Sequence, residues 1–218
     1  GKGTGRTEKS NWPSYINFMK AQLTELLTNY NVAGVWFDGH WDQTEDKNRT
    51  NHATYVDWHY PEIYELIHSI RPECLIANNH HLPPLPGESY QVFERDVPGE
   101  NEAGHSGQAV SHETCQTISA SWGFNITDDK FKSTKELLHL LIRTAGTGAN
   151  LLLNVGPMPN GVIQPECVSR LQQMGEWLNK YGYTIYETQQ GFVKPQTWGA
   201  STKKGNVYYL HILNKETE

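Results

Sequence analysis

The stretch Val32-Ala33-Gly34-Val35-Trp36-Phe37-Asp38-Gly39 decides the fold class of this chain. Its apolar run is too short for a helix, and it ends at an Asp-Gly pair, which is typical of a turn. A continuous apolar run of this length predicts a strand that is buried on both faces, as in a parallel sheet. An amphipathic helix is predicted before it, over residues 11–29, with Pro13 in the first turn.

Strands and helices alternate along the rest of the chain. Ser133 followed by Glu136 predicts a capping box at the start of one of the helices. Repeated strand-helix units predict an α/β fold whose parallel strands are joined by right-handed crossovers. The predicted helices span residues 61–70, 133–145 and 165–181, and the predicted strands span residues 74–77, 90–93, 115–120 and 150–155.

Polar or charged residues follow the ends of several predicted strands, which favours an incomplete TIM-like (β/α)8 barrel. Such a barrel builds its site from the carboxyl ends of its strands. We count about five of the eight strands and expect the other three to be supplied by sequence before residue 1. An open doubly wound sheet is the alternative, but no Gly-x-Gly-x-x-Gly or phosphate-binding loop supports it. After Tyr186 the pattern changes to short strands, so we divide the chain into a barrel portion, residues 1–186, and a second portion, residues 187–218.

Composition excludes several classes of protein. The chain has 218 residues, a mass of 24.8 kDa and a formal net charge of -6. It has no stripe of Lys and Arg, so we expect neither a nucleic-acid partner nor an anionic membrane partner. No apolar run approaches the roughly 18 to 20 residues of a membrane-spanning helix. The scattered Cys74, Cys115 and Cys167 form neither a disulfide framework nor a zinc motif, and we expect them to be small buried side chains.

Asp38 is the first candidate catalytic residue, because it ends a predicted buried strand and has tryptophans on both sides. Trp36 and Trp41 suit packing against the C–H face of a sugar ring, and His40 is a further candidate for substrate binding in this segment. An ionised carboxylate in this place suits the nucleophile of a glycosidase, where it stabilises an oxocarbenium-like transition state. The alternative is that Asp38 caps the following turn, which is common for Asp before Gly.

A retaining glycosidase also needs a second carboxyl group, about 5 Å from the first, as general acid and then base. Glu94 lies next to Arg95, which would hold it ionised and make it a poor acid. Glu100 has no adjacent cation, so burial on substrate binding would favour its protonated form. Glu113 is another candidate, or equally a structural partner. The alternative for the carboxylates of this loop is that they only solvate it: Glu94, Asp96, Glu100 and Glu102.

The pair His80-His81 follows a predicted strand and its two asparagines. Adjacent residues of an extended segment face opposite ways, so the two imidazoles cannot easily share a metal ion. We therefore predict no metal site and expect His80 to hydrogen-bond substrate hydroxyls or a neighbouring carboxylate.

Several segments together resemble glycoside hydrolase family 29, the α-L-fucosidases, and they cover nearly the whole chain. The family's His-His-Asp-Gly segment has no counterpart here, because the Asn-Asn-His-His sequence at residues 78–81 follows a later strand. The matching segments are Val35-Trp36-Phe37-Asp38-Gly39, Phe93-Glu94-Arg95-Asp96-Val97-Pro98-Gly99-Glu100-Asn101, Glu113-Thr114-Cys115, Ser121-Trp122-Gly123-Phe124, Gly148-Ala149-Asn150-Leu151-Leu152-Leu153-Asn154-Val155-Gly156-Pro157 and Gly175-Glu176-Trp177-Leu178.

This resemblance implies a retaining exo-hydrolase that removes terminal α-L-fucose from glycoconjugates, with Asp38 as nucleophile. It implies Trp36 and Trp41 in the sugar pocket, Glu100 as first and Glu94 as second choice for the acid/base, and no metal or organic cofactor. Residues 187–218 would start a C-terminal β-sandwich, and the chain would be a fragment that needs the missing N-terminal barrel portion for a complete fold. The implied partner is a fucosylated glycan, and the implied compartment is periplasmic, secreted or lysosomal.

Two alternatives remain open at the level of sequence. The chain could be an inactive or binding-only fragment that keeps the aromatic sugar pocket without turnover. It could also be a retaining glycosidase with another sugar preference, since two carboxylates and tryptophans do not encode fucose.

Overall fold

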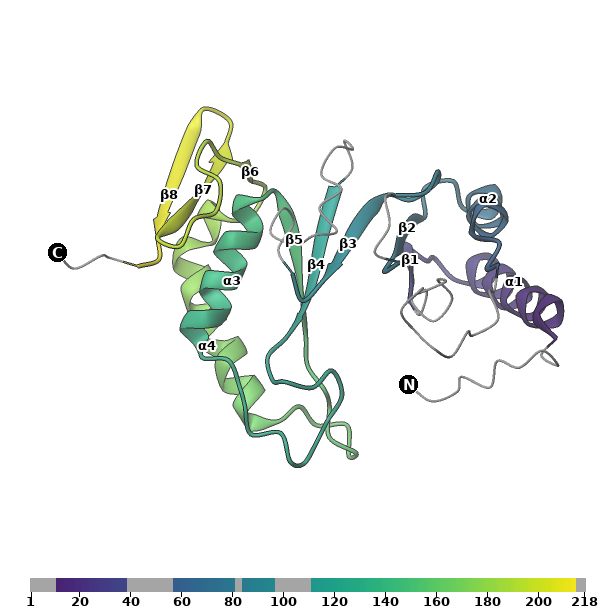
Figure 1. Cartoon of the computed structure of the whole chain (residues 1–218), viewed down its shortest axis with the longest axis horizontal. Coiled ribbons are helices and arrows are strands. Elements are labelled where there is room, and N and C mark those ends of the chain that lie inside the picture. The colour runs from purple at the N-terminus through teal and green to yellow at the C-terminus, as the bar shows by residue number, and fades with distance from the viewer. Residues whose placement is uncertain (1–10, 39–56, 81–83, 97–110, 215–218) are drawn as a thin grey trace, which may run out of the picture. The chain divides into compact units, whose positions relative to one another are not determined.

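A computed structural model describes residues 11–38, 57–80, 84–96 and 111–214 of the chain (Figure 1). The chain divides into two compact units, residues 1–92 and 93–218. The helices are α1 (Trp12–Asn29), α2 (Tyr60–Ile70), α3 (Thr134–Gly146), α4 (Pro165–Tyr181) and the short 3-10 helix η2 (Gly182–Thr184). The strands are β1 (Gly34–Phe37), β2 (Leu75–Asn78), β3 (Tyr90–Glu94), β4 (Ser111–Thr117), β5 (Ala149–Asn154), β6 (Gln189–Gln190), β7 (Gly199–Lys204) and β8 (Val207–Ile212).

The first five strands form one sheet in the order β1-β2-β3-β4-β5. β1 pairs in parallel with β2, β2 with β3, and β4 with β5. Strands in sequence order are those of a (β/α) barrel, whereas a doubly wound sheet reverses its order at a switch point. The predicted fold class, an incomplete barrel, is therefore confirmed.

A separate antiparallel sheet follows, in the order β6-β7-β8. It packs against α3 within the second unit: a Cβ added to Gly146 of α3 would lie 2.8 Å from Ala200 Cβ of β7. The division between the compact units falls inside β3. The boundary that we expect between residues 186 and 187 stays a prediction.

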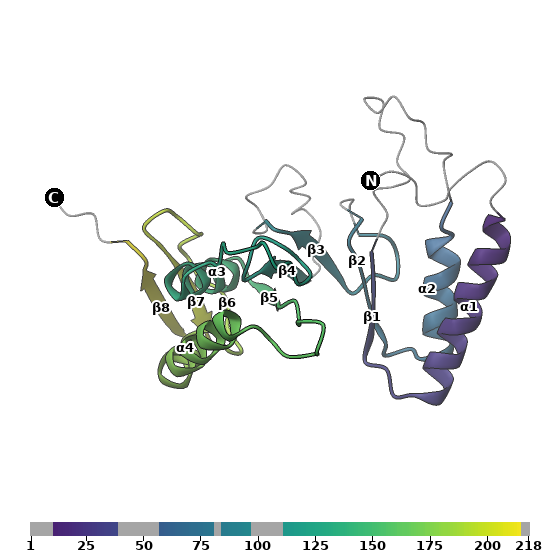
Figure 2. The ribbon, with the colours of Figure 1, turned by 90° about the horizontal axis from the view of Figure 1, so that it is seen from below.

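In the first unit, α1 and α2 lie side by side and cover one face of β1 and β2 (Figure 2). Val35 and Phe37 of β1 pack into this core. Because side chains alternate along a strand, Trp36 lies on the face of β1 away from the helices. The buried residues of the core are Leu23, Leu27, Tyr60, Ile63, Tyr64, Ile67, Cys74 and Ile76.

Contacts at both ends hold α1 and α2 together. At the N-terminal end, the rings of Trp12 and Trp58 meet edge to face with centroids 5.3 Å apart. At the C-terminal end, the Arg71 guanidinium donates to Leu27 O over 3.0 Å and to Tyr30 O over 2.8 Å. These carbonyls lie at the end of α1, where backbone acceptors lack helical partners and a cation is favourable.

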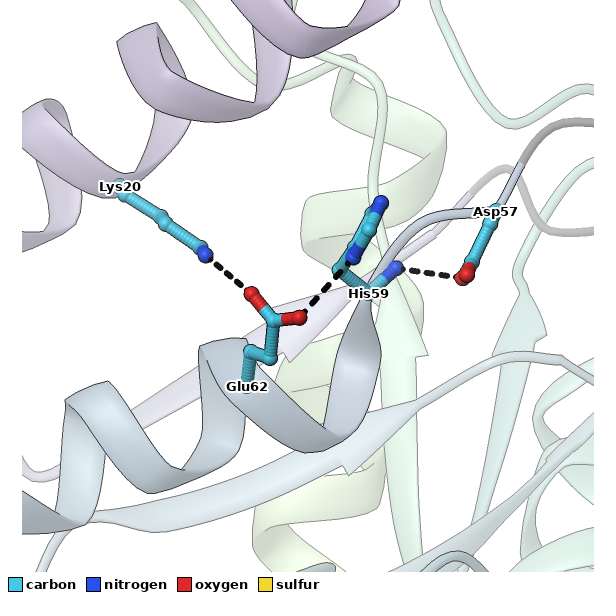
Figure 3. Close-up of polar contacts among 4 residues, drawn as sticks. All are labelled: Lys20, Asp57, His59 and Glu62. Carbon is cyan, nitrogen blue, oxygen red and sulfur yellow. Dashed lines mark hydrogen bonds and ion pairs between the residues drawn. The ribbon is translucent and has the colours of Figure 1, made fainter.

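A polar bridge also links the two helices (Figure 3). Lys20 of α1 donates to a Glu62 oxygen of α2 over 2.6 Å, and His59 Nδ1 lies 3.1 Å from the other oxygen. Asp57 accepts from the His59 backbone N–H over 2.8 Å, and His59 has a left-handed conformation with φ 54°. The hydrogen bond with Lys20 lowers the pKa of Glu62. Because Glu62 is exposed, we expect the bridge to contribute little to stability.

In the second unit, α3 and α4 pack together beside β5. Their buried core contains Ile118, Leu137, Cys167 and Met174. The predicted capping box is confirmed at the start of α3: the Ser133 hydroxyl accepts from the Glu136 N–H over 3.2 Å, and the Glu136 carboxylate accepts from the Ser133 N–H over 2.7 Å.

Replacing Ser133 by Ala should lower the free energy of unfolding by about 1 kcal/mol, because a backbone donor of α3 loses its acceptor. A separate contribution comes from the Glu136 carboxylate, whose pKa is lowered by its hydrogen bonds with the backbone and hydroxyl of Ser133; it is present above the ordinary Glu pKa and is lost as the pH falls through the lowered value. Urea denaturation at neutral and acidic pH measures both effects. Ser169→Ala on the exposed face of α4 is the control, and equal midpoints for the two variants would contradict the prediction.

The three cysteines are buried free thiols, as predicted. Burial raises the pKa of Cys74 and of Cys167, which makes these two poor nucleophiles. Within the described ranges, no helix has the length and apolar character needed to cross a membrane.

Candidate active site

Asp38 follows directly after β1 and is exposed. β1 pairs with β2 so that Phe37 is in register with Asn78. The next residue, Asn79, therefore reaches Asp38: its backbone N–H donates to Phe37 O over 2.9 Å, and its Nδ2 donates to Asp38 Oδ1 over 3.2 Å. A nucleophile must be accessible to the substrate and held in one orientation. Asp38 is exposed, and the hydrogen bond from Asn79 orients its carboxylate.

The residues on either side of Asn79 bond to groups in the core. Asn78 Nδ2 donates to the Tyr64 hydroxyl over 2.8 Å, and that hydroxyl donates to Glu88 Oε1 over 2.8 Å. His80 Nε2 lies 2.8 Å from the same Glu88 oxygen, and both side chains of this pair are 1% exposed. Burial raises the pKa of Tyr64, so its hydroxyl remains a donor at physiological pH.

Two of these residues were missed as site residues by the sequence analysis, Asn79 and Glu88. Asn79 could have been found, because it follows β2 at the level at which Asp38 follows β1. Glu88 has no such signal, since it precedes β3 in a Gly-Glu-Ser loop. Of the two partners that we predict for His80, the structure supplies the carboxylate.

The structure describes only some of the remaining candidate residues. Trp36 is half-buried on β1, on the face away from the helices. His40, Trp41 and Glu100 lie outside the described residues, as does Glu102.

Glu94 ends β3 in the second unit and is half-buried. The next residue, Arg95, has a left-handed backbone with φ 59°, and its N–H donates to Cys115 O over 2.9 Å. The Arg95 guanidinium donates to Ala120 O over 3.0 Å and lies 4.9 Å from the centre of the Trp122 ring. These contacts fix Arg95 against the segment that follows β4.

Glu113 is half-buried on β4, in register with Asn150 of β5. The next side chain, Thr114, is fully buried, and its hydroxyl donates to Phe93 O over 3.0 Å and also contacts Asp96 O. Backbone and side-chain bonds thus tie β4 to the residues around Glu94, within the second unit.

The described residues hold no group of three His, Cys, Asp or Glu that could bind a metal ion. The second unit does contain a cavity of about 390 Å³ lined by α3, α4 and β8, with Lys135, His139, Trp177 and His211 among its residues. Burial lowers the pKa of His139 and of His211, so both are neutral at neutral pH. The candidate carboxylates lie on other elements.

Comparison with known proteins gives one consistent result. A family model described as alpha-L-fucosidase matches residues 2–183. A plasma alpha-L-fucosidase of Pongo abelii is 31% identical over 216 residues, covering 90% of this chain and 42% of the relative. An alpha-L-fucosidase of Branchiostoma floridae is 30% identical, covering 87% of this chain and 39% of the relative.

Among solved structures, alpha-L-fucosidase isoenzyme 1 from Paenibacillus thiaminolyticus superposes with a TM-score of 0.78 at 26% identity. The match covers 96% of this chain and 49% of that chain. The chain thus spans about two fifths of the length of the curated relatives it matches.

Proposed function

This chain belongs to the α-L-fucosidase family, and on that premise we propose that it carries the nucleophile of a retaining exo-glycosidase. Its substrate would be a glycoconjugate that ends in an α-L-fucosyl residue. The observation that carries the proposal is Asp38, an exposed carboxylate directly after a barrel strand and held by Asn79. This is the place where a (β/α) barrel presents catalytic groups.

The reaction has two steps. In the first, an Asp38 oxygen bonds to the anomeric carbon of fucose while the glycosidic C–O bond breaks, and a carboxylic acid gives its proton to the leaving oxygen. In the second, the resulting carboxylate takes a proton from water as the water oxygen displaces Asp38 from the same carbon. The sugar is released with its original anomeric configuration, and both carboxyl groups return to their starting states.

For the acid, we propose Glu100 first and Glu94 second. The place of Glu94, half-buried at the end of β3, supports keeping it, because a (β/α) barrel presents catalytic groups at the ends of its strands. Glu113 is the third candidate, since Thr114 ties its strand to the residues next to Glu94. Trp36, His40 and Trp41 are proposed to contact the substrate, whereas His80 is proposed to serve substrate binding indirectly, through its contact with the buried Glu88 carboxylate.

A binding-only role is the second candidate function, and it rests on the aromatic side chain of Trp36 on the strand that ends at Asp38. Under this alternative, Trp36 and Asp38 would hold a fucosyl residue without breaking its bond. For the location of the protein, the words plasma and tissue in the names of several relatives support a secreted or lysosomal enzyme.

The test is release of the aryl alcohol from an aryl α-L-fucoside by the full-length polypeptide that carries this sequence. Matched aryl α-D-galactoside and β-D-glucoside substrates are the controls. Hydrolysis of the fucoside alone is expected. Preference for another sugar would overturn the substrate, and fucose binding by a folded sample without any hydrolysis would favour the binding-only role.

A further inference from the structure

The end of β2 presents alternating residues to two different partners. Asn79 holds Asp38, whereas Asn78 and His80 bond to the buried Tyr64–Glu88 pair. Since side chains alternate along an extended segment, the residue that holds the carboxylate is flanked by two that are fixed to the core.

Glu88 is the centre of these buried contacts. One of its oxygens accepts from the Tyr64 hydroxyl and faces His80 Nε2, and the other accepts from the Leu85 N–H over 3.0 Å. Tyr64 and Leu85 belong to segments on either side of β2 in the chain, so one carboxylate joins three segments. The preceding Gly87 has φ +98°, and a Cβ there would lie 3.2 Å from Tyr64 Cβ, so a glycine suits the turn that brings Glu88 to Tyr64.

We propose that Glu88 is a positioning residue for the reaction, acting on Asp38 through Asn79. The inference rests on the proposed function only in so far as Asp38 is the nucleophile. Glu88 fixes residues 78 and 80, which sets the backbone of Asn79 and therefore the direction of its Nδ2 donor. A carboxylate suits this role because it accepts on both oxygens, whereas an amide has one accepting end.

The test compares Glu88→Gln and Glu88→Asp with wild type in the full-length polypeptide, with an aryl α-L-fucoside as substrate. A small displacement of a reacting group costs up to about 100-fold in rate. We therefore expect kcat per folded molecule to fall about 10- to 100-fold with little change in KM. Ile63→Val is the control, because Ile63 is fully buried in the same core but makes none of these polar contacts. Unchanged kcat per folded molecule in both Glu88 variants, with only lower thermal stability, would overturn the proposal.

A second measurement separates this proposal from the proposed function. The Asn79 N–H, which bonds to Phe37 O, should exchange with deuterium faster in Glu88→Gln than in Ile63→Val when the two variants are compared at equal stability. Equal exchange would overturn the positioning role even if the enzyme is active. A third outcome is faster exchange in Glu88→Gln together with full activity in Asp38→Ala. It would show that Glu88 positions Asn79 and that Asp38 is not the nucleophile.

Discussion

The Asp38→Ala variant is expected to lose hydrolysis of an aryl α-L-fucoside by about 10³-fold or more, because no group remains to bond to the anomeric carbon. The rate of aryl alcohol release by the full-length polypeptide measures this. Asp57→Ala is the matched control, since Asp57 is another exposed carboxylate of the first unit and accepts from the His59 backbone N–H. A rate within a few-fold of wild type in Asp38→Ala would show that another residue is the nucleophile.

The covalent intermediate gives an independent readout of the same prediction. A 2-fluoro-fucosyl fluoride slows breakdown of a glycosyl-enzyme, so the sugar should remain attached to the peptide that contains Asp38. Mass spectrometry of the digested protein locates the label. A label on any peptide without Asp38 would contradict the assignment.

Replacing the acid/base should have the second largest effect, and its size should depend on the leaving group. Loss of general acid catalysis costs about 10²- to 10⁴-fold for a sugar or alkyl leaving group, which needs a proton. A dinitrophenyl leaving group needs none, so fucosylation of Asp38 should be far less affected. We expect this contrast for Glu100→Gln, or else for Glu94→Gln.

The three variants Glu94→Gln, Glu100→Gln and Glu113→Gln serve as controls for one another, since each replaces one carboxyl group by an amide of similar size in the same part of the chain. The ratio of the rates on the two substrates is measured for each variant. One variant should differ from the other two. A changed ratio in Glu113→Gln alone would assign the general acid to Glu113 on β4. Ratios equal to that of wild type in all three variants would show that none of these residues is the acid.

Much of the fold could be predicted because it follows from local patterns. α4 begins at Pro165 and ends at Tyr181, as its periodicity predicts, and the apolar run before Asp38 forms β1. The predicted strand at residues 115–120 was wrong at both ends, since β4 spans Ser111–Thr117. Residues 111–114 contain no apolar run, and their strand depends on pairing with β5, where His112 is in register with Ala149. A single segment of sequence does not contain that pairing.

The site could be predicted only in part for the same reason. Asp38 has a local signal, a carboxylate after a buried strand and between tryptophans. Glu88 is bonded to Tyr64, 24 residues earlier, and its role depends on chain segments meeting in space. Arg95 likewise has a partner that its neighbours in the sequence do not indicate, since its guanidinium bonds to Ala120, 25 residues later.

The contacts between α1 and α2 determine which residues of the first unit selection for stability acts on. Trp58 packs on Trp12 and Arg71 bonds to the end of α1, so α2 is located by its neighbouring helix. None of these contacts involves His40 or Trp41, the residues that we propose for substrate binding between β1 and α2. If His40 and Trp41 bind the substrate as proposed, selection for specificity and selection for stability would act on different residues of the first unit.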